Sequence, residues 1–466
     1  MASIFSHMKN VYLSMSPPIP APSENDHEPL RMGILGAANI APNAVIVPSK
    51  SSTGLEVTSV AARDSKRAEE FAKSHGIAKV YGSYDALLKA DDVDVVYNPL
   101  PNGLHLKWTT EAVMNGKDVL CEKPLASNAQ QAREMFAVAR EHNRVVLEAF
   151  HYRFHPSLHE FAYHLRKALT PENPLVGVKA SMMVPGGFIK DSDIRFSYPL
   201  AGGALMDCGV YPISTVLYAV RVAGEGARAG SNFDFATWSS GIEVVNADSV
   251  LFSTSDKKVL EAKAYLNARG EPGIDEATSA RLLVPVPGSP ARQKVPCEIS
   301  ASLKTYRDTK IPLLGWRVPK LSLPTVEATL KDGTKVELVN YIAPSIYHCI
   351  TVTSPSGQQQ QYKAYTPSPN SSTDLGVTAA VDGKWEPTVG KPWWTTYRYM
   401  VEAFDLGVQA FKRGTAPMFV APPSSADDAK NRKGGWAPVW MDNRESEVVM
   451  ECVDKIYEKT GLGKRI

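Results

Sequence analysis

The sequence contains few cysteines, and they follow no pattern. An odd number of them is spread over 466 residues, at Cys121, Cys208, Cys297, Cys349 and Cys452. Without paired spacings they predict neither a disulfide framework nor a zinc-binding motif. Such cysteine usage is typical of a reducing compartment, so we expect a cytoplasmic protein.

Long apolar runs and an excess of one charge are also missing. No uninterrupted apolar run reaches the ~18–20 residues that a membrane span needs. The 51 basic side chains nearly balance the 49 acidic ones, which leaves a net charge of only +2. Such a balance does not favour a polyanionic partner. We therefore predict a soluble globular protein that binds neither a membrane nor a nucleic acid.

Residues 1–29 lack the marks of a targeting signal. Residues 1–30 contain no arginine, which a transit peptide needs, and no continuous apolar stretch, which a secretory signal needs. The run at residues 16–23 is rich in proline, and such a segment cannot bury enough apolar area to offset its ordering entropy. We expect residues 1–29 to be a disordered tail.

The length predicts two domains, because 466 residues exceed one ordinary core. In residues 30–150 apolar strands alternate with amphipathic helices. The expected strands are 31–35, 55–62, 93–97, 118–120 and 144–147, and the expected helices are 64–75, 107–115 and 127–142, besides a short one from Ser83. This alternation predicts βαβ units, and hence an α/β, Rossmann-type doubly wound parallel sheet that binds a dinucleotide.

Strands dominate the predicted second domain, residues 151–440. The strand-like runs include 176–184, 249–252, 280–286, 326–330 and 336–339. Asp332-Gly333 predicts a tight hairpin turn between the last two runs. These features predict an α+β domain built on a large, mostly antiparallel open sheet. The apolar stripe of the last helix, within residues 441–466, predicts that this helix packs back on the body.

The loop after the first strand carries part of a dinucleotide fingerprint. The pattern requires Gly-x-Gly-x-x-Gly/Ala between a strand and a helix, and its three positions hold Gly36, Ala38 and Ala41. Gly36 permits the tight turn, whereas Ala38 adds a methyl group where the backbone must approach pyrophosphate. We therefore predict that Gly36, Ala38, Asn39 and Ile40 contact the cofactor.

Arginines stand at the end of the second strand, where Arg63 is followed by Arg67 one helical turn on. An NAD-selective site usually places a carboxylate here to accept the ribose 2′-hydroxyl, whereas a guanidinium can bind a 2′-phosphate bidentately. NADP is therefore the favoured cofactor, and NAD the less favoured one. Asp64 lies beside Arg63, so solvated charges at a helix N-terminus remain the alternative.

Two further strand ends carry candidate cofactor-binding residues. The third strand is followed by Asn98, Pro99, Leu100 and His105, and the fourth by Glu122-Lys123-Pro124. Pro124 fixes its own φ and keeps Lys123 out of the helical region. Ser127 with Gln130 forms a capping box that predicts the next helix start. Because the carboxyl ends of parallel strands meet at one edge, these loops should converge there with the fingerprint loop.

The second domain offers a glycine-rich entry to an apolar helix. Gly202-Gly203 precedes Asp207 and Tyr211, which lie four residues apart and so share one helix face. The glycines would let that face approach a ligand. The alternative is a connector into a core helix, with Tyr211 as an ordinary core residue.

Three histidines, His151, His155 and His159, are spaced four apart, as ligands on one helix face would be. Pro156 interrupts the helix that they would need to share. Buried or solvated histidines are also commoner than ligating ones, so we predict no metal site.

Together, four runs resemble the Gfo/Idh/MocA oxidoreductase family: Gly36-x-Ala-x-Ile-Ala, Glu122-Lys123-Pro124, Arg153-Phe154 and Gly202-Gly203-x-Leu-x-Asp207-x-Gly209-x-Tyr211. The similarity covers roughly residues 30–220 and, more loosely, the final helix. It is closest to the branch with NADP-dependent D-xylose 1-dehydrogenase and the dimeric trans-dihydrodiol dehydrogenases, where runs resembling Val60-Ala-Ala-Arg-Asp and Ile194-Arg-Phe also occur. Residues 223–392 look longer than is usual in that branch, which leaves the substrate open.

The resemblance implies roles for individual residues. Lys123 and Tyr211 would be catalytic, Asp207 would contact substrate or orient the lysine, and the nucleotide would lie on the loop at residues 36–41. The open sheet of the second domain would be the surface of a homodimer.

These features predict hydride transfer between nicotinamide and a carbon bearing a hydroxyl, best C1 of an aldose such as D-xylose. Tyr211 would act as the base, with its pKa lowered by the Lys123 ammonium. Arg153 and His155 are candidates to bind substrate hydroxyls, together with Asp207 and Tyr211. Two alternatives stay open: a non-catalytic NADP-sensing regulator, and a dehydrogenase or reductase of a non-sugar metabolite such as a trans-dihydrodiol.

Overall fold

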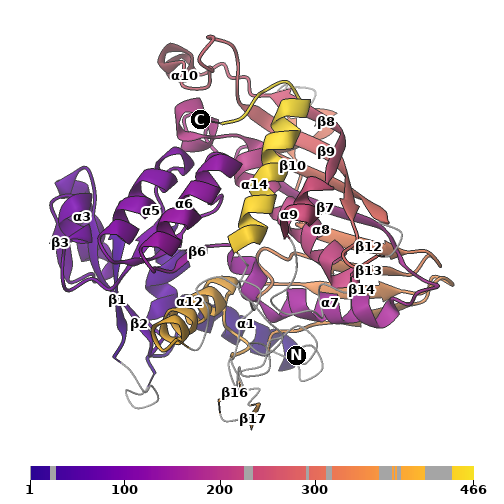
Figure 1. Cartoon of the computed structure of the whole chain (residues 1–466), viewed down its shortest axis with the longest axis horizontal. Helices are drawn as coiled ribbons and strands as arrows, with labels where there is room; N and C mark the ends of the chain where they lie inside the picture. Colours follow the sequence, from indigo (N-terminus) through magenta and orange to yellow (C-terminus); the bar gives the residue numbers. More distant parts are fainter. Residues whose placement is uncertain are drawn as a thin grey trace.

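The computed structural model describes residues 2–20, 28–224, 235–289, 293–310, 317–366, 380–381, 384–385, 390–414 and 443–465. Two sheets lie side by side, each with its own helices, and helix α14 (Asn443–Lys459) lies between them (Figure 1). The predicted boundary at residue 440 falls outside the described residues.

The first sheet has six parallel strands in the order β3-β2-β1-β4-β5-β6. They are β1 (Leu30–Leu35), β2 (Leu55–Ala61), β3 (Lys79–Tyr81), β4 (Val95–Asn98), β5 (Asp118–Cys121) and β6 (Val146–Glu148). This is the strand order of a doubly wound dinucleotide-binding sheet, so the predicted Rossmann-type fold is confirmed. The sequence prediction lacks β3, because three residues are too few to show a strand period.

Short helices connect these strands. They are the π-helix η1 (Pro42–Ile46), α2 (Val47–Ser49), α3 (Ser65–His75), α4 (Tyr84–Leu88), the 3₁₀ turn η2 (Asn102–Leu104), α5 (His105–Met114) and α6 (Ala129–Glu141). α3 begins at the Asp64 cap and ends at Gly76, whose φ of 73° favours glycine. The short crossover from β1 to β2 leaves room for a helix from elsewhere in the chain.

Helix α12 (Thr396–Lys412) occupies that place. It packs beside η1, α2 and β2, and Met400, Val401, Phe404 and Val408 share one hydrophobic core with the first sheet. The predicted boundaries assign this segment to the second domain, and its packing corrects them. A sequence pattern shows that a helix is amphipathic but not which sheet its apolar face covers.

The start of α6 differs from the predicted capping box by one residue. The cap is Asn128, whose side chain accepts a hydrogen bond from the Gln131 amide at 2.9 Å. Ser127 lies buried before it, and its Oγ has no hydrogen-bond partner among the described residues. Asn and Ser cap almost equally well, so local preference alone could not choose between neighbouring positions.

The second sheet is large and open, with the strand order β15-β14-β13-β12-β7-β10-β9-β8 and with β11 paired to β10. Its strands are β7 (Leu175–Pro185), β8 (Glu243–Leu251), β9 (Asp275–Pro285), β10 (Lys294–Lys310), β11 (Arg317–Pro319), β12 (Thr325–Leu330), β13 (Lys335–Val339), β14 (Cys349–Thr353) and β15 (Gln359–Tyr362). Among the described strands of this sheet only β7 and β10 pair in parallel, so the predicted mostly antiparallel sheet is confirmed. Gly333, with φ 91°, makes the predicted turn between β12 and β13. A separate two-stranded pair is formed by β16 (Ala380–Val381) and β17 (Lys384–Trp385).

The second domain also forms helical elements, and several of them pack against strands of the sheet. The elements are η3 (His151–Phe154), α7 (Pro156–Ala168), η4 (Ile194–Phe196), η5 (Tyr198–Leu200), the π-helix η6 (Leu205–Gly209), α8 (Val210–Ala223), α9 (Phe235–Ser240) and α10 (Lys257–Ala262). The stretch Tyr198–Ala223 is long and apolar enough to cross a membrane, but 89% of its apolar window is buried in the fold, as in a core helix. α14 packs against α6, α8 and β8, so the last helix does lie back on the body.

A helix, α1 (Ala2–Met15), lies within the segment predicted to be a disordered tail. Met8, Val11, Tyr12 and Met15 follow helical spacing, a signal that the proline-rich run behind them outweighed in the prediction. Met8, Tyr12 and Met15 are each more than 60% exposed. The tail prediction is therefore wrong for this helix, and residues 21–27 lie outside the described part of the chain.

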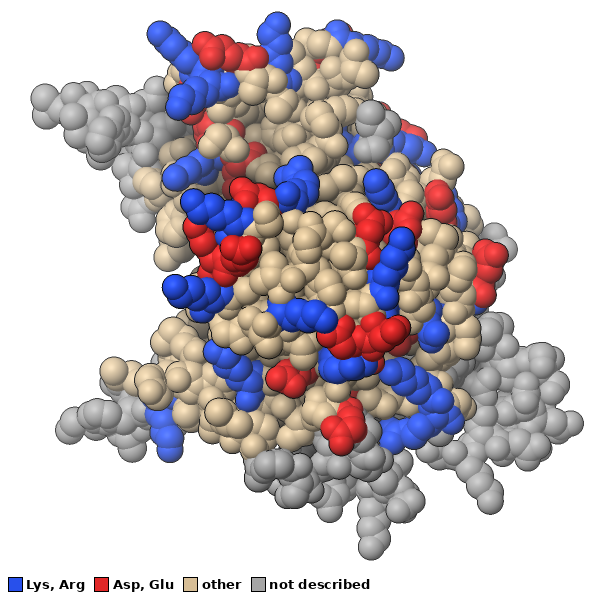
Figure 2. Space-filling view, turned by 90° about the vertical axis from the view of Figure 1, so that its left-hand side faces the viewer, with Lys and Arg blue, Asp and Glu red and all other residues tan. Residues whose placement is uncertain are grey.

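The charged surface agrees with the balanced composition. On the face that carries the first domain, Lys and Arg side chains are interspersed with Asp and Glu side chains (Figure 2).

Candidate functional site

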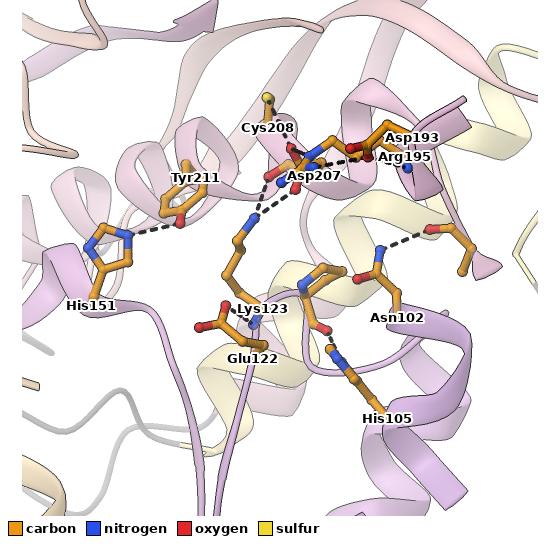
Figure 3. A network of polar contacts seen from close by, with 12 residues as sticks. Asn102, His105, Glu122, Lys123, His151, Asp193, Arg195, Asp207, Cys208 and Tyr211 are labelled. Carbon is orange, nitrogen blue, oxygen red and sulfur yellow. Dashed lines mark hydrogen bonds and ion pairs between the residues drawn. The ribbon is translucent and has the colours of Figure 1, made fainter. Parts of the chain in front are cut away.

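Lys123 lies where the two domains meet, directly after β5. Its ammonium donates to Asp207 Oδ1 at 2.9 Å and to the Asp207 carbonyl at 3.1 Å. It also lies 5.1 Å from the centre of the Tyr211 ring. Lys123 reaches from the first domain toward Asp207 and Tyr211 on the helix of the second (Figure 3). The predicted convergence of these three side chains is thus present in the structure.

Arg195 completes a charged cluster at this place. Its Nε donates to Asp207 Oδ2 at 2.8 Å, and its Nη1 pairs with Asp193 at 3.0 Å. We call Lys123, Asp207 and Arg195 the cleft triad; their side chains are 14%, 18% and 38% exposed. The sequence prediction missed Arg195, although the Ile194-Arg-Phe run that the resemblance noted marks its position.

The cleft triad holds its charges in their ionised forms. Burial alone would raise the pKa of Asp207, but the Lys123 and Arg195 cations outweigh it and hold that pKa well below its usual range. Burial would lower the pKa of Lys123, and the Asp207 and Glu122 carboxylates outweigh that effect and raise it. At neutral pH the site therefore presents an ammonium ion beside the Tyr211 phenol.

Tyr211 contacts a histidine that the prediction did not place in the site. The phenol oxygen lies 3.0 Å from His151 Nε2, and His151 Nδ1 lies 2.7 Å from Thr396 Oγ1. The Tyr397 ring stacks on His151, with centroids 4.1 Å apart. Thr396 and Tyr397 come from the first turn of α12, so their presence here could be found only from the folded chain.

The expected lowering of the Tyr211 pKa is not what the structure gives. Burial raises the pKa of Tyr211 well above its ordinary value, and the Glu122 and Asp207 carboxylates raise it further. Burial, and then the Lys123 charge, lower the pKa of His151 to about 3. Tyr211 is therefore a neutral phenol that can donate to a neutral imidazole. The prediction considered the lysine and overlooked the burial of the phenol, which is the largest cause, and the two carboxylates.

The loops after β4 and β5 are held together by buried polar groups. His105, fully buried, places Nδ1 2.9 Å from the Pro124 carbonyl and Nε2 2.6 Å from the Leu100 carbonyl. Asn98 donates to Thr109 Oγ1 at 3.0 Å. These two side chains position the backbone at Leu100 and Pro124. Any contact with a cofactor from this region would come from the loop itself, including Pro99.

The Glu122 carboxyl group contacts the backbone of Lys123. Tyr97 donates to Glu122 Oε1 at 2.7 Å, and the Lys123 amide lies 3.2 Å from Oε2. Burial raises the pKa of Glu122, while the Lys123 charge lowers it. This carboxylate fixes the loop and adds negative charge behind the ammonium.

The end of β1 offers a cradle that fits a dinucleotide. Gly36 has φ 92°, and a Cβ there would lie 3.1 Å from Leu100 Cδ2, so the turn requires glycine. Arg67 donates to the Ala37 carbonyl at 3.0 Å, and Arg63 is exposed at the end of β2. The three residues that follow Ala37 are partly open to solvent: Ala38 and Ile40 are half-buried, and Asn39 is exposed. A tight turn bordered by two guanidinium groups suits a phosphate-bearing cofactor.

Arg153 and His155, the two predicted substrate contacts outside the helix, lie in the core. Arg153 is fully buried and pairs with Glu445 of α14 at 2.9 Å. His155 is also fully buried and caps α7, with its Nδ1 accepting from the Ser157 amide at 3.2 Å. Neither side chain is available to a substrate, so this part of the prediction is corrected.

The three spaced histidines have separate environments. His151 contacts Tyr211, His155 caps α7, and His159 is buried near Arg153. In the described part of the chain, no three His, Cys, Asp or Glu side chains are grouped so that they could hold a metal ion.

The fold and the cradle define a two-domain protein with a dinucleotide-binding domain. Residues 30–150 match the model of the GFO_IDH_MocA family, described as an oxidoreductase family with an NAD-binding Rossmann fold. Residues 30–150 are therefore similar to the Rossmann domain of that family, as the resemblance implied.

Relatives of known activity match a larger segment of the chain. A D-xylose 1-dehydrogenase (NADP(+)) from Haloferax volcanii is 41% identical over 185 residues, which are 40% of this chain and 55% of the relative. A trans-1,2-dihydrobenzene-1,2-diol dehydrogenase from Xenopus tropicalis is 36% identical over 187 residues, 40% of this chain and 55% of the relative. The matched segment thus spans about half the length of these relatives.

Solved structures extend the likeness of fold to nearly the whole chain. A 3-ketoreductase from Actinomadura kijaniata, in complex with NADP and TDP-benzene, covers 92% of this chain and 98% of its own, with 21% identity and a TM-score of 0.60. An aldose-aldose oxidoreductase from Caulobacter crescentus covers 93% of this chain and 98% of its own, with 15% identity and a TM-score of 0.60. The second domain therefore also has the fold of these two-domain proteins.

Proposed function

We propose that this protein is an NADP-dependent oxidoreductase that acts on a sugar-like hydroxyl or carbonyl carbon, with C1 of an aldose such as D-xylose as the first substrate to test. The observation that carries the proposal is the ammonium of Lys123, paired with Asp207, beside the Tyr211 phenol at the carboxyl edge of a dinucleotide-binding sheet. Ligands of such sheets bind at that edge.

Lys123 and Tyr211 have different roles in moving the proton of the substrate oxygen. A nicotinamide cofactor supplies or accepts the hydride when it is bound. In the reductive direction the Lys123 ammonium polarises the carbonyl oxygen, and Tyr211 donates its proton to that oxygen as it becomes a hydroxyl. In the oxidative direction the same step runs in reverse: the Tyr211 phenolate that the reductive step leaves takes the proton of the substrate hydroxyl, and His151 Nε2 stays neutral and accepts a hydrogen bond from the restored phenol.

NADP is preferred to NAD because of the two arginines that follow β2. Arg63 is exposed there, and Arg67 lies against the Ala37 carbonyl of the cradle. Guanidinium groups at this place suit a 2′-phosphate. The names of the relatives include NADP(+) as the cofactor of the xylose dehydrogenase.

A second candidate is reduction of a ketone on a deoxysugar, or oxidation of a trans-dihydrodiol. A dTDP-3,4-didehydro-2,6-dideoxy-alpha-D-glucose 3-reductase from Actinomadura kijaniata is 40% identical over 185 residues, close to the value for the xylose dehydrogenase. Identity over this segment does not choose among the substrates, because the second domain lines the other half of the cleft.

We further propose a homodimer through the open sheet. Its polar face carries a depression of 610 Å³ lined by residues of β7, β9, β10 and β12, among them the ion pair of Lys179 with Glu298 at 2.9 Å. Cross-strand pairs of opposite charge suit a self-complementary face. The five buried free cysteines suit the reducing cytoplasm that we expect.

The test follows the absorbance of reduced nicotinamide with D-xylose, D-glucose, a trans-dihydrodiol and a ketosugar, with NADP(H) and with NAD(H). Lys123→Met and Tyr211→Phe should each lower turnover by about 10²–10⁴-fold, with nucleotide affinity nearly unchanged. Near-normal turnover in either variant would reject the assigned role. Tight nucleotide binding without turnover on any substrate would favour the NADP-sensing regulator instead.

A further inference from the structure

Arg465, in the segment after α14, is a fully buried cation beside the glycines that precede Asp207. Its Nη2 pairs with Asp275 at 3.0 Å, and both side chains have no exposed surface. The guanidinium lies 4.0 Å from the centre of the Tyr457 ring. Neither the family resemblance nor the chemistry of the site draws attention to this residue.

On one side Arg465 holds the backbone that leads to Asp207. Its Nε donates to the Gly202 carbonyl at 3.1 Å, and its partner Asp275 accepts from the Leu205 amide at 2.7 Å. Gly203 has φ 133°, and a Cβ there would collide with Asp275. The glycines of this segment thus allow its backbone to lie close to Asp275 and Arg465. This contact explains why glycine is needed here, without the approach to a ligand that the sequence suggested.

On the other side Arg465 holds the loop of Lys123. The carbonyl of Arg465 accepts from Asn128 Nδ2 at 2.8 Å. Asn128 caps α6 directly after the Lys123 loop, and its Oδ1 is already used by the Gln131 amide. One residue therefore connects the backbones that carry both members of the ion pair.

We infer that Arg465 is a positioning residue that sets the distance between Lys123 and Asp207. The ion pair reaches the second domain only through the long side chain of Lys123, whereas Arg465 bonds to the Gly202 carbonyl and, through its own carbonyl, to the cap of α6. A displacement of about 1 Å in such an arrangement can cost about a hundredfold in rate. The kinetic part of this inference rests on the proposed function; the geometric part does not.

The experiment compares Arg465→Gln and Arg465→Lys with Lys464→Gln. Lys464 is the matched control, because it is the neighbouring cation but has a side chain 53% exposed, paired with Glu458 at the surface. Arg465→Gln removes the counter-charge of a buried carboxylate and should lower stability. Asp275 keeps three donors, the Leu205 amide, Thr278 and Tyr457, which limit the loss. Arg465→Lys also keeps the positive charge.

The first measurement is the rate at which an amine-reactive reagent labels Lys123, read by mass spectrometry of the peptide. Arg465→Gln should raise this rate several-fold, because the ammonium is no longer held against Asp207, and Lys464→Gln should leave it unchanged. An unchanged rate in Arg465→Gln would overturn the inference, even if the melting temperature falls. If Arg465→Gln does not fold, Arg465→Lys decides by the same criterion.

The second measurement is steady-state kinetics with whichever substrate of the panel under Proposed function the wild-type protein turns over. Arg465→Gln should lower kcat by about a hundredfold and change KM much less, because the lost geometry acts on the reacting groups. A change in KM alone would overturn the inference. If the wild-type chain turns over no substrate, the proposed function fails, and the labelling of Lys123 still decides the role of Arg465.

Discussion

Two clusters in this protein have the same arrangement of charges and different environments. In the cleft triad Asp207 lies between Lys123 and Arg195. In a second cluster Glu445 lies between Arg153, at 2.9 Å, and Arg221, at 3.2 Å. We call Arg153, Glu445 and Arg221 the core triad. Each triad holds one carboxylate between two cations.

The triads differ in what surrounds them. The Arg153 and Glu445 side chains are 0% and 1% exposed, and Arg153 lies 4.2 Å from the centre of the Tyr218 ring. Lys123 and Asp207 keep 14% and 18% of their surface. In the core triad protein groups take up the charges, whereas in the cleft triad part of each charge remains available to a ligand.

This comparison separates stability from function. Removing one member of a buried ion pair leaves an uncompensated charge in the core, which is strongly destabilising. Removing one member of a partly solvated pair costs less, because water replaces the lost partner. We therefore expect mutations in the core triad to act on folding and mutations in the cleft triad to act on turnover.

The largest effect should come from Glu445→Gln. It leaves Arg153 buried without its counter-charge and should lower the free energy of unfolding by about 3–5 kcal/mol, as measured by urea denaturation. The control is Glu451→Gln on the same helix, since Glu451 pairs with Arg133 at the surface and should contribute less than about 1 kcal/mol. Equal losses in the two variants would remove the distinction between the triads.

The next largest effect should come from Asp207→Asn. It releases Lys123 from its partner and should lower turnover by about a hundredfold, or about 2.7 kcal/mol of activation free energy. Its loss of folding stability should be smaller than that of Glu445→Gln. A variant that unfolds as readily as Glu445→Gln, or that keeps its turnover, would place the cleft triad with the structural ion pairs.

The same comparison shows what the sequence could predict. Alternating strands and helices gave the parallel sheet, and the rule that strand ends meet at one edge brought Lys123 to the cleft. The motif with Asp207 and Tyr211 then supplied the other side. These predictions combine local sequence patterns with one topological rule, and such patterns can be recognised in a single sequence.

What could not be predicted depends on partners far along the chain. Arg153 was a candidate to bind substrate hydroxyls, yet its partner Glu445 lies 292 residues later. His151 belongs to the site because Thr396 and Tyr397 reach it from α12. Burial and pairing of this kind arise only when distant segments pack, so residue type and position could not reveal them.

A third prediction concerns pH and His159, which lies near the core triad. Burial, and then the Arg153 charge, lower the pKa of His159 to about 3. In the unfolded chain this imidazole binds its proton near pH 6.5, so the unfolded state gains stability as the pH falls from about 6.5 toward about 3. Between pH 7 and 5 this one residue should cost about 2 kcal/mol of folding stability.

His159→Gln should remove that cost, so that its stability falls less than that of the wild type between pH 7 and 5. Urea denaturation at both pH values measures the difference. The control is His142→Gln, because His142 is exposed at the end of α6. If both variants show the same pH dependence as the wild type, the environment of the core triad is more solvated than the structure indicates.

The smallest effect should come from the outer cation of the core triad. Arg221 is 21% exposed, and Arg221→Gln leaves Glu445 paired with Arg153. The loss of folding stability should be about 1 kcal/mol or less, since water can solvate the carboxylate oxygen that the Arg221 guanidinium no longer contacts. Urea denaturation of Arg221→Gln and of Glu445→Gln, side by side, therefore measures how much of the lost folding stability comes from leaving a buried charge without a partner. A loss equal to that of Glu445→Gln would mean that the number of partners, and not the exclusion of water, distinguishes the core triad from the cleft triad.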